Sequence, residues 1–209
     1  MADFALLEAL LHEPGSGYFL LERHLARLGA SATHFGFPFD LEHTRAQLAL
    51  FARGLPATPR KVRLELFADR ALFLEHKDLR PSTTVRAALA ATPVDSRDEL
   101  LRHKTSRRAV YERALATRPA GTDDVVLWNE RGELTETSSA NLVLALGGRR
   151  VTPPVACGLL PGTFRAELLA RGELEERVLQ RGDLARAEGI FLVNSVRRFC
   201  PIELRGEGA

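Results

Sequence analysis

The sequence predicts a mixed α/β fold that is divided into two lobes. Apolar segments that read as strands alternate with segments such as Leu21–Phe35, in which apolar residues recur at helical spacing. At 209 residues the chain can bury a sizeable core, either as one domain or as two small lobes. Pro81 lies in a stretch without clear periodicity and marks the candidate connection. We therefore expect a small N-terminal α/β lobe over residues 1–79 and a larger C-terminal α/β lobe over residues 80–209.

The N-terminal lobe is expected to combine strands with two helices. The apolar run at residues 4–11 predicts a buried strand, and the turn at Glu13–Gly17 reverses the chain into a hairpin. Asp40 precedes a second helical pattern and is a candidate N-cap. The other elements expected in this lobe are a return strand at 18–20, helices at 21–35 and 40–53, and strands at 61–68 and 71–75.

The C-terminal lobe is expected to alternate short strands with helices. Gly147 and Gly148 predict a two-residue hairpin turn between two of the strands. Strands are expected at 85–91, 125–128, 141–146, 150–152, 174–179 and 190–194, and helices at 106–116, 161–170 and 182–187.

Composition and charge argue against several classes of function. The 29 Lys and Arg residues are scattered among 27 Asp and Glu, for a net charge of +2, so we expect no nucleic-acid partner. No apolar stretch approaches membrane-spanning length and the start lacks a basic leader, so we expect no membrane partner. Cys157 and Cys200 fit a reducing cytoplasm better than a disulfide scaffold. The histidines form no zinc-binding motif, so no metal is expected.

A lysine, a glutamate and a glycine-marked turn stand out as candidates for chemistry. Lys104 is one of only three lysines and precedes a predicted helix, and Glu136 precedes an apolar strand. The stretch 158–165 then predicts a turn that opens another helix. A reactive amine, a carboxylate and a helix start that can bind an anion are the parts that a pyridoxal phosphate enzyme needs. Taken alone, a lysine before a helix is more often a solvent-exposed side chain.

The segments that carry these residues resemble the class IV aminotransferase family, the fold type IV pyridoxal phosphate enzymes. The matching stretches are 103–111, 134–144 and 158–165, and the most specific piece is the acid at 136 with Asn141 five residues beyond it. Members include branched-chain aminotransferases, D-amino acid aminotransferases and aminodeoxychorismate lyases, and the resemblance is closest to the lyase-like branch. It implies a two-lobed α/β fold and pyridoxal 5'-phosphate as cofactor.

The resemblance also implies a role for each matching residue. Lys104 would form the Schiff base with the cofactor and move the Cα proton, and Glu136 would pair with the pyridine nitrogen. The phosphate would be bound by the side chain of Arg27, the backbone amides of Thr163 and Phe164, and the hydroxyl of Ser195.

Three of these residues also have an ordinary interpretation. Arg27 could be a surface arginine on an amphipathic helix, Ser195 could cap a turn, and Glu136 could lie in an exposed turn. Arg107, Arg197 and Arg198 are further candidates that could bind a substrate carboxylate or serve only the structure.

The chain departs from the family pattern in three places. The family usually has another strand and turn before the segment that begins here at Phe4. Lyase members can carry a threonine where Ala9 lies here. Branched-chain members place a tyrosine shortly after the lysine; Tyr111 lies two positions too far along, so we expect it to pack on a helix face.

Three functions remain open from the sequence. The first is a lyase that converts 4-amino-4-deoxychorismate to 4-aminobenzoate and pyruvate, in folate biosynthesis. The second is a class IV aminotransferase that acts on an amino acid and a 2-oxo acid. The third, from another class, is a degenerate binding module without turnover. The family resemblance implies a small-molecule substrate and a homodimer.

Overall fold

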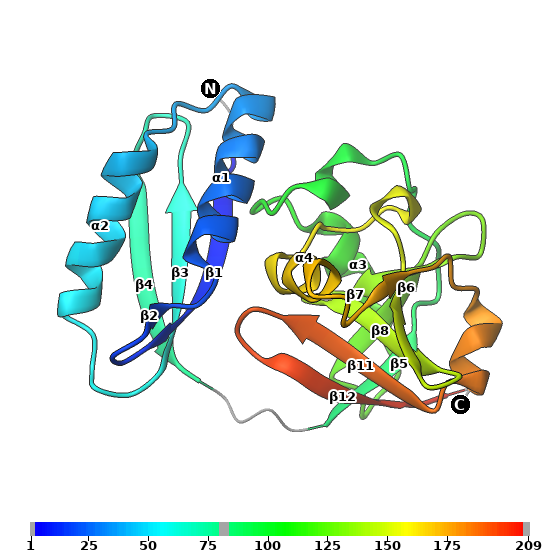
Figure 1. Ribbon diagram of the computed structural model, residues 1–209. Coiled ribbons are helices and arrows are strands. Elements are labelled where there is room, and N and C mark those ends of the chain that lie inside the picture. The colour runs from blue at the N-terminus through cyan, green and yellow to red at the C-terminus, as the bar shows by residue number, and fades with distance from the viewer. Residues whose placement is uncertain (1–2, 80–83, 207–209) are drawn as a thin grey trace. The chain divides into compact units, whose positions relative to one another are not determined.

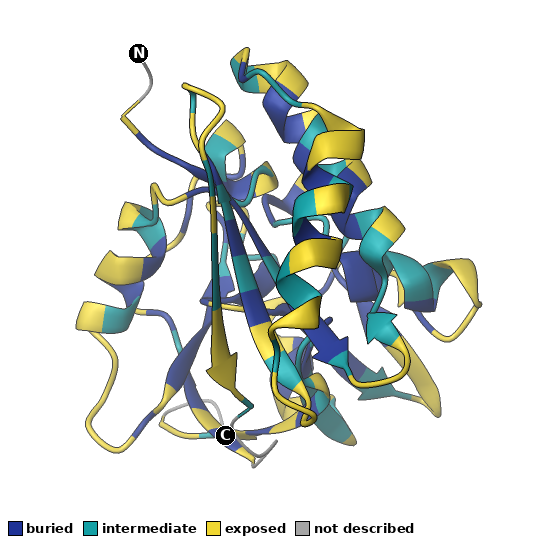
Figure 2. Ribbon diagram, turned by 90° about the vertical axis from the view of Figure 1, so that its left-hand side faces the viewer, coloured by how far each residue is buried: buried dark blue, intermediate teal, exposed yellow. Residues whose placement is uncertain are grey.

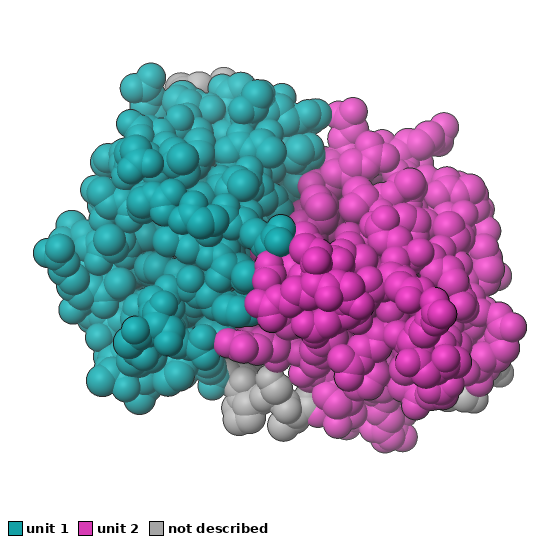
Figure 3. Space-filling view, in the orientation of Figure 1, with its two compact units in different colours: residues 1–81, 103–107 teal, residues 82–102, 108–209 magenta. Residues whose placement is uncertain are grey.

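The structure is a computed structural model that describes residues 3–79 and 84–206. Its contacts divide the chain into two compact units (Figure 1, Figure 3). The first unit contains residues 1–81 together with 103–107, and the second contains residues 82–102 and 108–209. The connection expected at Pro81 lies outside the described residues.

The first unit is a four-stranded antiparallel sheet with two helices packed on it (Figure 1). Its strands lie in the order β2-β1-β3-β4. The elements are β1 (Leu6–Glu13), β2 (Gly17–Tyr18), α1 (Leu21–Phe35), α2 (Leu41–Arg53), β3 (Arg60–Leu66) and β4 (Leu72–Asp78). The hairpin, both helices and the second strand pair therefore lie within three residues of their predicted bounds. Asp40 caps α2 as expected, because its carboxylate accepts a hydrogen bond of 2.9 Å from the backbone N–H of His43.

One apolar cluster joins both helices to the same face of this sheet. Leu6 and Leu10 of β1 point to that face, because side chains alternate along a strand. Leu25 and Leu28 of α1 and Leu48 of α2 complete the centre of the cluster, and each is 2% exposed or less. Figure 2 shows buried and exposed residues alternating along the helices. The face that receives α1 also carries Glu8, two residues from each of the two leucines of β1.

Residues 103–107 belong to the first unit because they pair with β1. The backbone N–H of Leu7 donates to the carbonyl of Lys104 at 2.8 Å, and that of Ser106 donates to Ala5 at 2.9 Å. The prediction of a helix from Ser106 is therefore wrong at its start: α3 spans Ala109–Ala116. An extended backbone is needed here to reach the edge of β1.

The second unit is an eight-stranded mixed sheet that returns on itself. The strands lie in the order β10-β9-β8-β11-β12-β5-β6-β7, and β7 also pairs with β8. Its strands are β5 (Val85–Leu89), β6 (Asp124–Trp128), β7 (Leu134–Thr137), β8 (Asn141–Leu146), β9 (Arg149–Thr152), β10 (Glu175–Glu176), β11 (Gly189–Asn194) and β12 (Arg198–Leu204). The pairing that closes the sheet joins Glu136 to Asn141.

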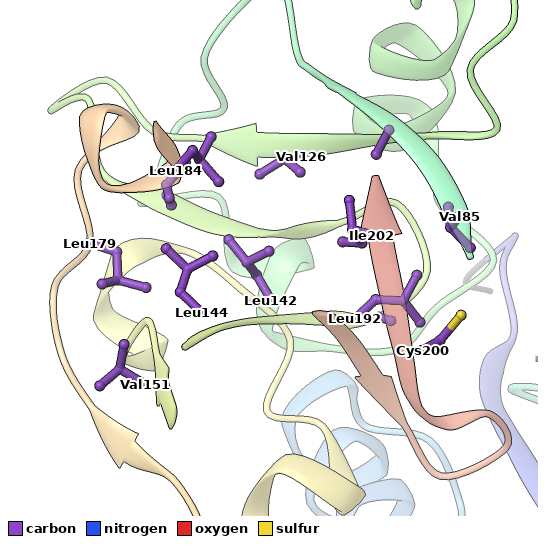
Figure 4. Close-up of a cluster of buried hydrophobic side chains, with 13 residues drawn as sticks. Val85, Val126, Leu142, Leu144, Val151, Leu179, Leu184, Leu192, Cys200 and Ile202 are labelled. Carbon is purple, nitrogen blue, oxygen red and sulfur yellow. The ribbon is translucent and has the colours of Figure 1, made fainter. Parts of the chain in front are cut away.

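Apolar side chains from most of these strands fill the centre of the second unit (Figure 4). Val126, Leu142, Leu144 and Leu192 are fully buried there. Burying one such side chain stabilises the fold by about 1.5–3 kcal/mol. A second cluster packs α3 against the other face of β6. This core holds the ends of β7 and β8, where the candidate residues lie.

Several elements of the second unit differ from the prediction. Helix α4 begins at Thr163 rather than at residue 161, because Gly162 is its N-cap. The strand expected at 174–179 is reduced to β10, and the helix expected at 182–187 is a 3-10 helix at Arg181–Arg186. Strand β12 was not predicted, because Pro201 and two charged residues, Arg198 and Glu203, interrupt its pattern. The Gly147-Gly148 turn is confirmed, with φ of 59° and 72°.

None of the helices in the described part of the chain is long and apolar enough to cross a membrane.

Candidate active site

The position of Lys104 is set by a backbone hydrogen bond and by the side-chain contacts of the preceding residue, His103. The carbonyl of Lys104 accepts the hydrogen bond from β1, while the Nδ1 atom of His103 lies 2.9 Å from Ser31 Oγ on α1. The His103 ring also stacks on that of His34, with ring centroids 4.3 Å apart. Lys104 is half-buried, and its backbone position is set jointly by β1 and α1.

The other two lysines lie in a different environment. Lys61 and Lys77 are cross-strand partners on β3 and β4, and both are exposed. The ammonium of Lys77 lies 3.3 Å from the carboxylate of Glu75. Partial burial therefore distinguishes Lys104 from both of the other lysines.

Arg27 is bound to a buried carboxylate on β1. Its Nε and Nη2 atoms donate to the two oxygens of Glu8 at 2.9 and 2.6 Å, which is a bidentate ion pair. The Nδ1 atom of His24, one turn earlier on α1, lies 2.7 Å from Glu8 Oε2. The Arg27 side chain is 12% exposed and that of Glu8 is 2% exposed. The alternative of a solvated surface arginine is wrong, since its guanidinium is held in one orientation.

The charge state of Glu8 follows from its partners. Burial raises the pKa of this carboxyl, but the charges of Arg27 and His24 and their hydrogen bonds outweigh burial and lower the pKa to about 2. Glu8 is therefore ionised at neutral pH and balances the positive charge of the arginine.

Glu136 lies on β7 and is 3% exposed, so the exposed-turn alternative is wrong. Tyr111 Oη donates to its Oε1 atom at 2.8 Å, and the backbone N–H of Leu160 donates to the same oxygen at 3.3 Å. The Nδ2 atom of Asn141 lies 3.4 Å from Oε2. Hydrogen-bond donors favour the ionised form of a carboxylate. The arrangement can therefore hold a negative charge in a buried place.

Asn141 connects this carboxylate to the start of α4. Its Nδ2 atom donates to the carbonyl of Leu160 at 2.8 Å. A Cβ atom added at Gly162 would lie only 1.9 Å from Asn141 Oδ1, so the turn requires glycine there. Gly162 is also the N-cap of α4 (Thr163–Ala170), which has no side-chain cap. The first amides of α4 thus follow directly on a turn that touches Glu136.

The structure places the other predicted residues in the second unit. Thr163 and Phe164 open α4 and are 5% and 7% exposed. Ser195 is 5% exposed and lies in the loop between β11 and β12. Asn194 organises that loop, because its Oδ1 atom accepts hydrogen bonds from the backbone N–H groups of Val196 and Arg197. Lys104 and Arg27 belong to the first unit.

The sequence interpretation missed the contacts of Glu8 and Tyr111. Glu8 interrupts an otherwise apolar strand, and a buried acid needs a partner of opposite charge. His24 and Arg27 lie one helical turn apart and could have been proposed as those partners. Tyr111 was expected only to pack on a helix face. A buried tyrosine hydroxyl usually finds a hydrogen-bond partner, which was the available signal.

These groups fit the chemistry of pyridoxal phosphate. The start of α4 has no side-chain cap and, as a helix N-terminus, favours an anion, and its glycine turn has no room for a side chain. Arg27 offers a guanidinium, which suits a phosphate. Glu136 offers a buried carboxylate for a protonated ring nitrogen. Among the described residues, no group of three or more His, Cys, Asp or Glu side chains is arranged to hold a metal ion.

Comparison with known proteins identifies the family. Residues 5–204 match the sequence profile described as amino-transferase class IV. A crystal structure from Mesorhizobium loti, provisionally named as an amino-acid aminotransferase, aligns with a TM-score of 0.91 and 37% identity. The alignment covers 97% of this chain and 100% of that one.

Two further relatives carry the name of a lyase. A Schizosaccharomyces pombe (strain 972 / ATCC 24843) protein, provisionally named as an aminodeoxychorismate lyase, is 28% identical over 96% of this chain and 89% of its own length. The structure of 4-amino-4-deoxychorismate lyase from Pseudomonas aeruginosa aligns with a TM-score of 0.77 and 27% identity, over 96% of this chain and 82% of that one. The chain is thus an enzyme rather than a binding module, and it belongs to the class IV aminotransferase family, whose cofactor is pyridoxal 5'-phosphate.

Proposed function

We propose that the protein is an aminodeoxychorismate lyase, which converts 4-amino-4-deoxychorismate to 4-aminobenzoate and pyruvate in folate biosynthesis. The observation that supports this most is the environment of Glu136, a buried carboxylate with hydroxyl and amide donors beside the start of α4. Such a carboxylate can keep the pyridine nitrogen of the cofactor protonated. The protonated ring then suits a reaction in which negative charge builds up on the carbon that bears the amino group. The choice of a lyase is supported by similarity to the two relatives that carry this name, over almost the whole chain.

Each predicted residue has a proposed task. The Nζ atom of Lys104 binds the cofactor and takes the proton from the carbon that bears the amino group. Glu136 keeps the proton on the pyridine nitrogen, while Arg27, Ser195 and the amides of Thr163 and Phe164 hold the phosphate. When bound, pyridoxal phosphate supplies a conjugated ring that delocalises the electron pair left behind by this proton.

The proposed reaction needs no oxidant. Loss of the proton from the ring carbon beside the nitrogen leaves an electron pair, which makes the ring aromatic as the bond to the enolpyruvyl oxygen breaks. The enolpyruvate that leaves takes up a proton and becomes pyruvate. Lys104 is the residue proposed to move the first proton and to return one.

The test supplies aminodeoxychorismate, generated in place by a separate synthase, to the protein reconstituted with pyridoxal phosphate. We expect pyruvate and 4-aminobenzoate to appear in equal amounts, and Lys104→Ala to abolish both. Lys77→Ala is the matched control and should keep full activity, since Lys77 is exposed on β4. Absence of pyruvate from the active protein would overturn the lyase proposal.

An aminotransferase is the second candidate, and the M. loti relative, at 37% identity, favours it. The same residues would serve both reactions until the proton is returned. Ala9 provides no hydroxyl where lyase members can carry a threonine, which also leaves this alternative open. A parallel assay offers amino acids with 2-oxoglutarate or pyruvate as acceptor. Amino transfer without release of pyruvate from aminodeoxychorismate would select the aminotransferase.

We also propose that the enzyme is a cytoplasmic homodimer, as the family resemblance implies. In the described part of the chain, Cys157 and Cys200 are buried and are not joined in a disulfide, which suits a reducing compartment. Sedimentation equilibrium should then give about twice the 23.1 kDa of one chain. A concentration-independent mass of one chain would rule the dimer out.

A further inference from the structure

The hydroxyl of Tyr111 makes the shortest hydrogen bond to Glu136 among the donors described above. The distance between Oη and Oε1 is 2.8 Å, against 3.3 Å for the Leu160 amide and 3.4 Å for Asn141. Tyr111 lies on α3 and Glu136 on β7, so the bond joins two elements of the same unit. Both residues are buried, at 9% and 3% exposure.

The direction of this hydrogen bond is fixed by the chemistry of the phenol. Burial and the negative charge of Glu136 raise the pKa of Tyr111 well above its usual value. The phenol is therefore protonated at any working pH, and its hydroxyl donates to the carboxylate. A donor of this kind favours the charged form of the acid.

Tyr111 is itself held in place from two sides. The guanidinium of Arg108 lies over its ring, 4.4 Å from the centroid, and also donates to the carbonyl of Ser138. The ring packs with Leu101 and Leu127 in the cluster that joins α3 to β6. A side chain fixed in this way can impose one orientation on the acid that it contacts.

We propose that Tyr111 is a positioning residue that acts through Glu136. Its hydroxyl holds Oε1, so that the carboxylate stays charged and in one orientation while it keeps the proton on the pyridine nitrogen. This inference rests on the proposed role of Glu136. It assigns to the tyrosine a task that its position in the sequence does not reveal.

The test compares Tyr111→Phe, Glu136→Gln and the double variant, each reconstituted with pyridoxal phosphate. The readouts are the pH profile of the visible absorption of the bound cofactor and the turnover number. Tyr111→Phe should shift the pH profile and lower turnover about tenfold, the loss expected for one hydrogen bond to a charged group. In the Glu136→Gln background the same change should have no further effect, because the carboxylate that Tyr111 acts on is gone.

Tyr18 offers a matched control, since it is the only other tyrosine in the chain. Its hydroxyl donates to the carbonyl of Leu48 at 3.0 Å in the first unit. Tyr18→Phe should leave the pH profile and turnover unchanged. It also makes Tyr111 the single tyrosine, so that incorporation of fluorotyrosine labels this position alone without removing the hydroxyl.

Fluorotyrosine at position 111 keeps the test decisive if Tyr111→Phe fails to fold. Its ¹⁹F resonance should move when pyridoxal phosphate binds, and this movement should be lost in Glu136→Gln. A resonance that does not respond to the cofactor, or an equal loss of turnover by Tyr111→Phe with and without Glu136, would overturn the positioning role. If Glu136→Gln itself leaves the pH profile and turnover unchanged, the proposed role of Glu136 fails, and the inference about Tyr111 fails with it.

Discussion

At the scale of single residues, the ion pair between Arg27 and Glu8 fixes the orientation of the guanidinium. A guanidinium on a helix surface would sample many orientations, whereas two hydrogen bonds to one buried carboxylate leave it a single one. His24 adds a third contact to the same acid. The ion pair therefore holds the guanidinium of Arg27 in one orientation, which would favour the proposed contact with a phosphate.

Glu8 should make the stability of the protein depend on pH. Its pKa of about 2 in the folded chain lies below the value of about 4.3 in an unfolded chain. The stabilisation is therefore present above pH 4.5 and is lost as the pH falls toward 2. A shift of this size corresponds to about 3 kcal/mol of unfolding free energy.

Urea denaturation of wild type and Glu8→Gln between pH 6 and pH 2.5 measures this effect. The variant should be less stable at pH 6, and the difference should shrink as the pH falls. Glu22→Gln on α1 is the control and should change little, because Glu22 is exposed in its pair with Arg45. A difference that stays constant with pH would contradict the assigned charge state of Glu8.

At the scale of elements, the start of β8 lies in close contact with the turn before α4. Asn141 ends the β7–β8 connection and binds Leu160, and Gly162 then packs against its side chain. The turn before α4 thus depends on the side chain that also contacts Glu136. A change at Gly162 should therefore disturb both the end of α4 that is proposed to bind the phosphate and the carboxylate of Glu136.

Gly162→Ala tests this coupling. The added Cβ would meet Asn141 Oδ1 at 1.9 Å, so the turn must move and cofactor affinity should fall by at least about tenfold. Gly182→Ala is the matched control, since nothing lies within 4 Å of a Cβ there and its φ is not positive. Titration of the apo-proteins with pyridoxal phosphate measures both. Equal affinities would show that the turn does not support the cofactor site.

The sequence predicted elements well where one periodicity dominates. Helices α1 and α2 and the hairpin after β1 were placed within a residue or two, because their patterns and caps agree with their final environment. It failed where tertiary pairing overrides local preference. Residues 104–106 carry no strand pattern, yet backbone hydrogen bonds to β1 hold this segment outside the helix. β12 was missed because its neighbours, rather than its own alternation, make it a strand.

The candidate site was predictable for residues that stand out by type and not for those that act through contacts. Lys104 and Glu136 were chosen by rarity and by the family resemblance. Glu8 and Tyr111 touch Arg27 and Glu136 only through the fold, from elements far away in sequence. Strand register and helix packing decide such contacts, and neither can be derived from local pattern alone.

At the scale of the whole molecule, each compact unit contributes a different part of the proposed chemistry. The first unit carries the amine and the guanidinium, on a segment and a helix that share β1 as their support. The second unit carries the carboxylate and the helix start, joined through Asn141. The central claim is that Lys104 is the lysine to which pyridoxal phosphate binds covalently.

Borohydride reduction of the protein with one equivalent of pyridoxal phosphate, followed by mass spectrometry of its peptides, tests that claim most directly. Three lysines are present, so every internal site of attachment can be distinguished. The pyridoxyl group should be found on Lys104, and Lys104→Ala should carry none while it remains folded. A pyridoxyl group on Lys61 or Lys77 instead, or an unlabelled wild-type protein, would contradict the account.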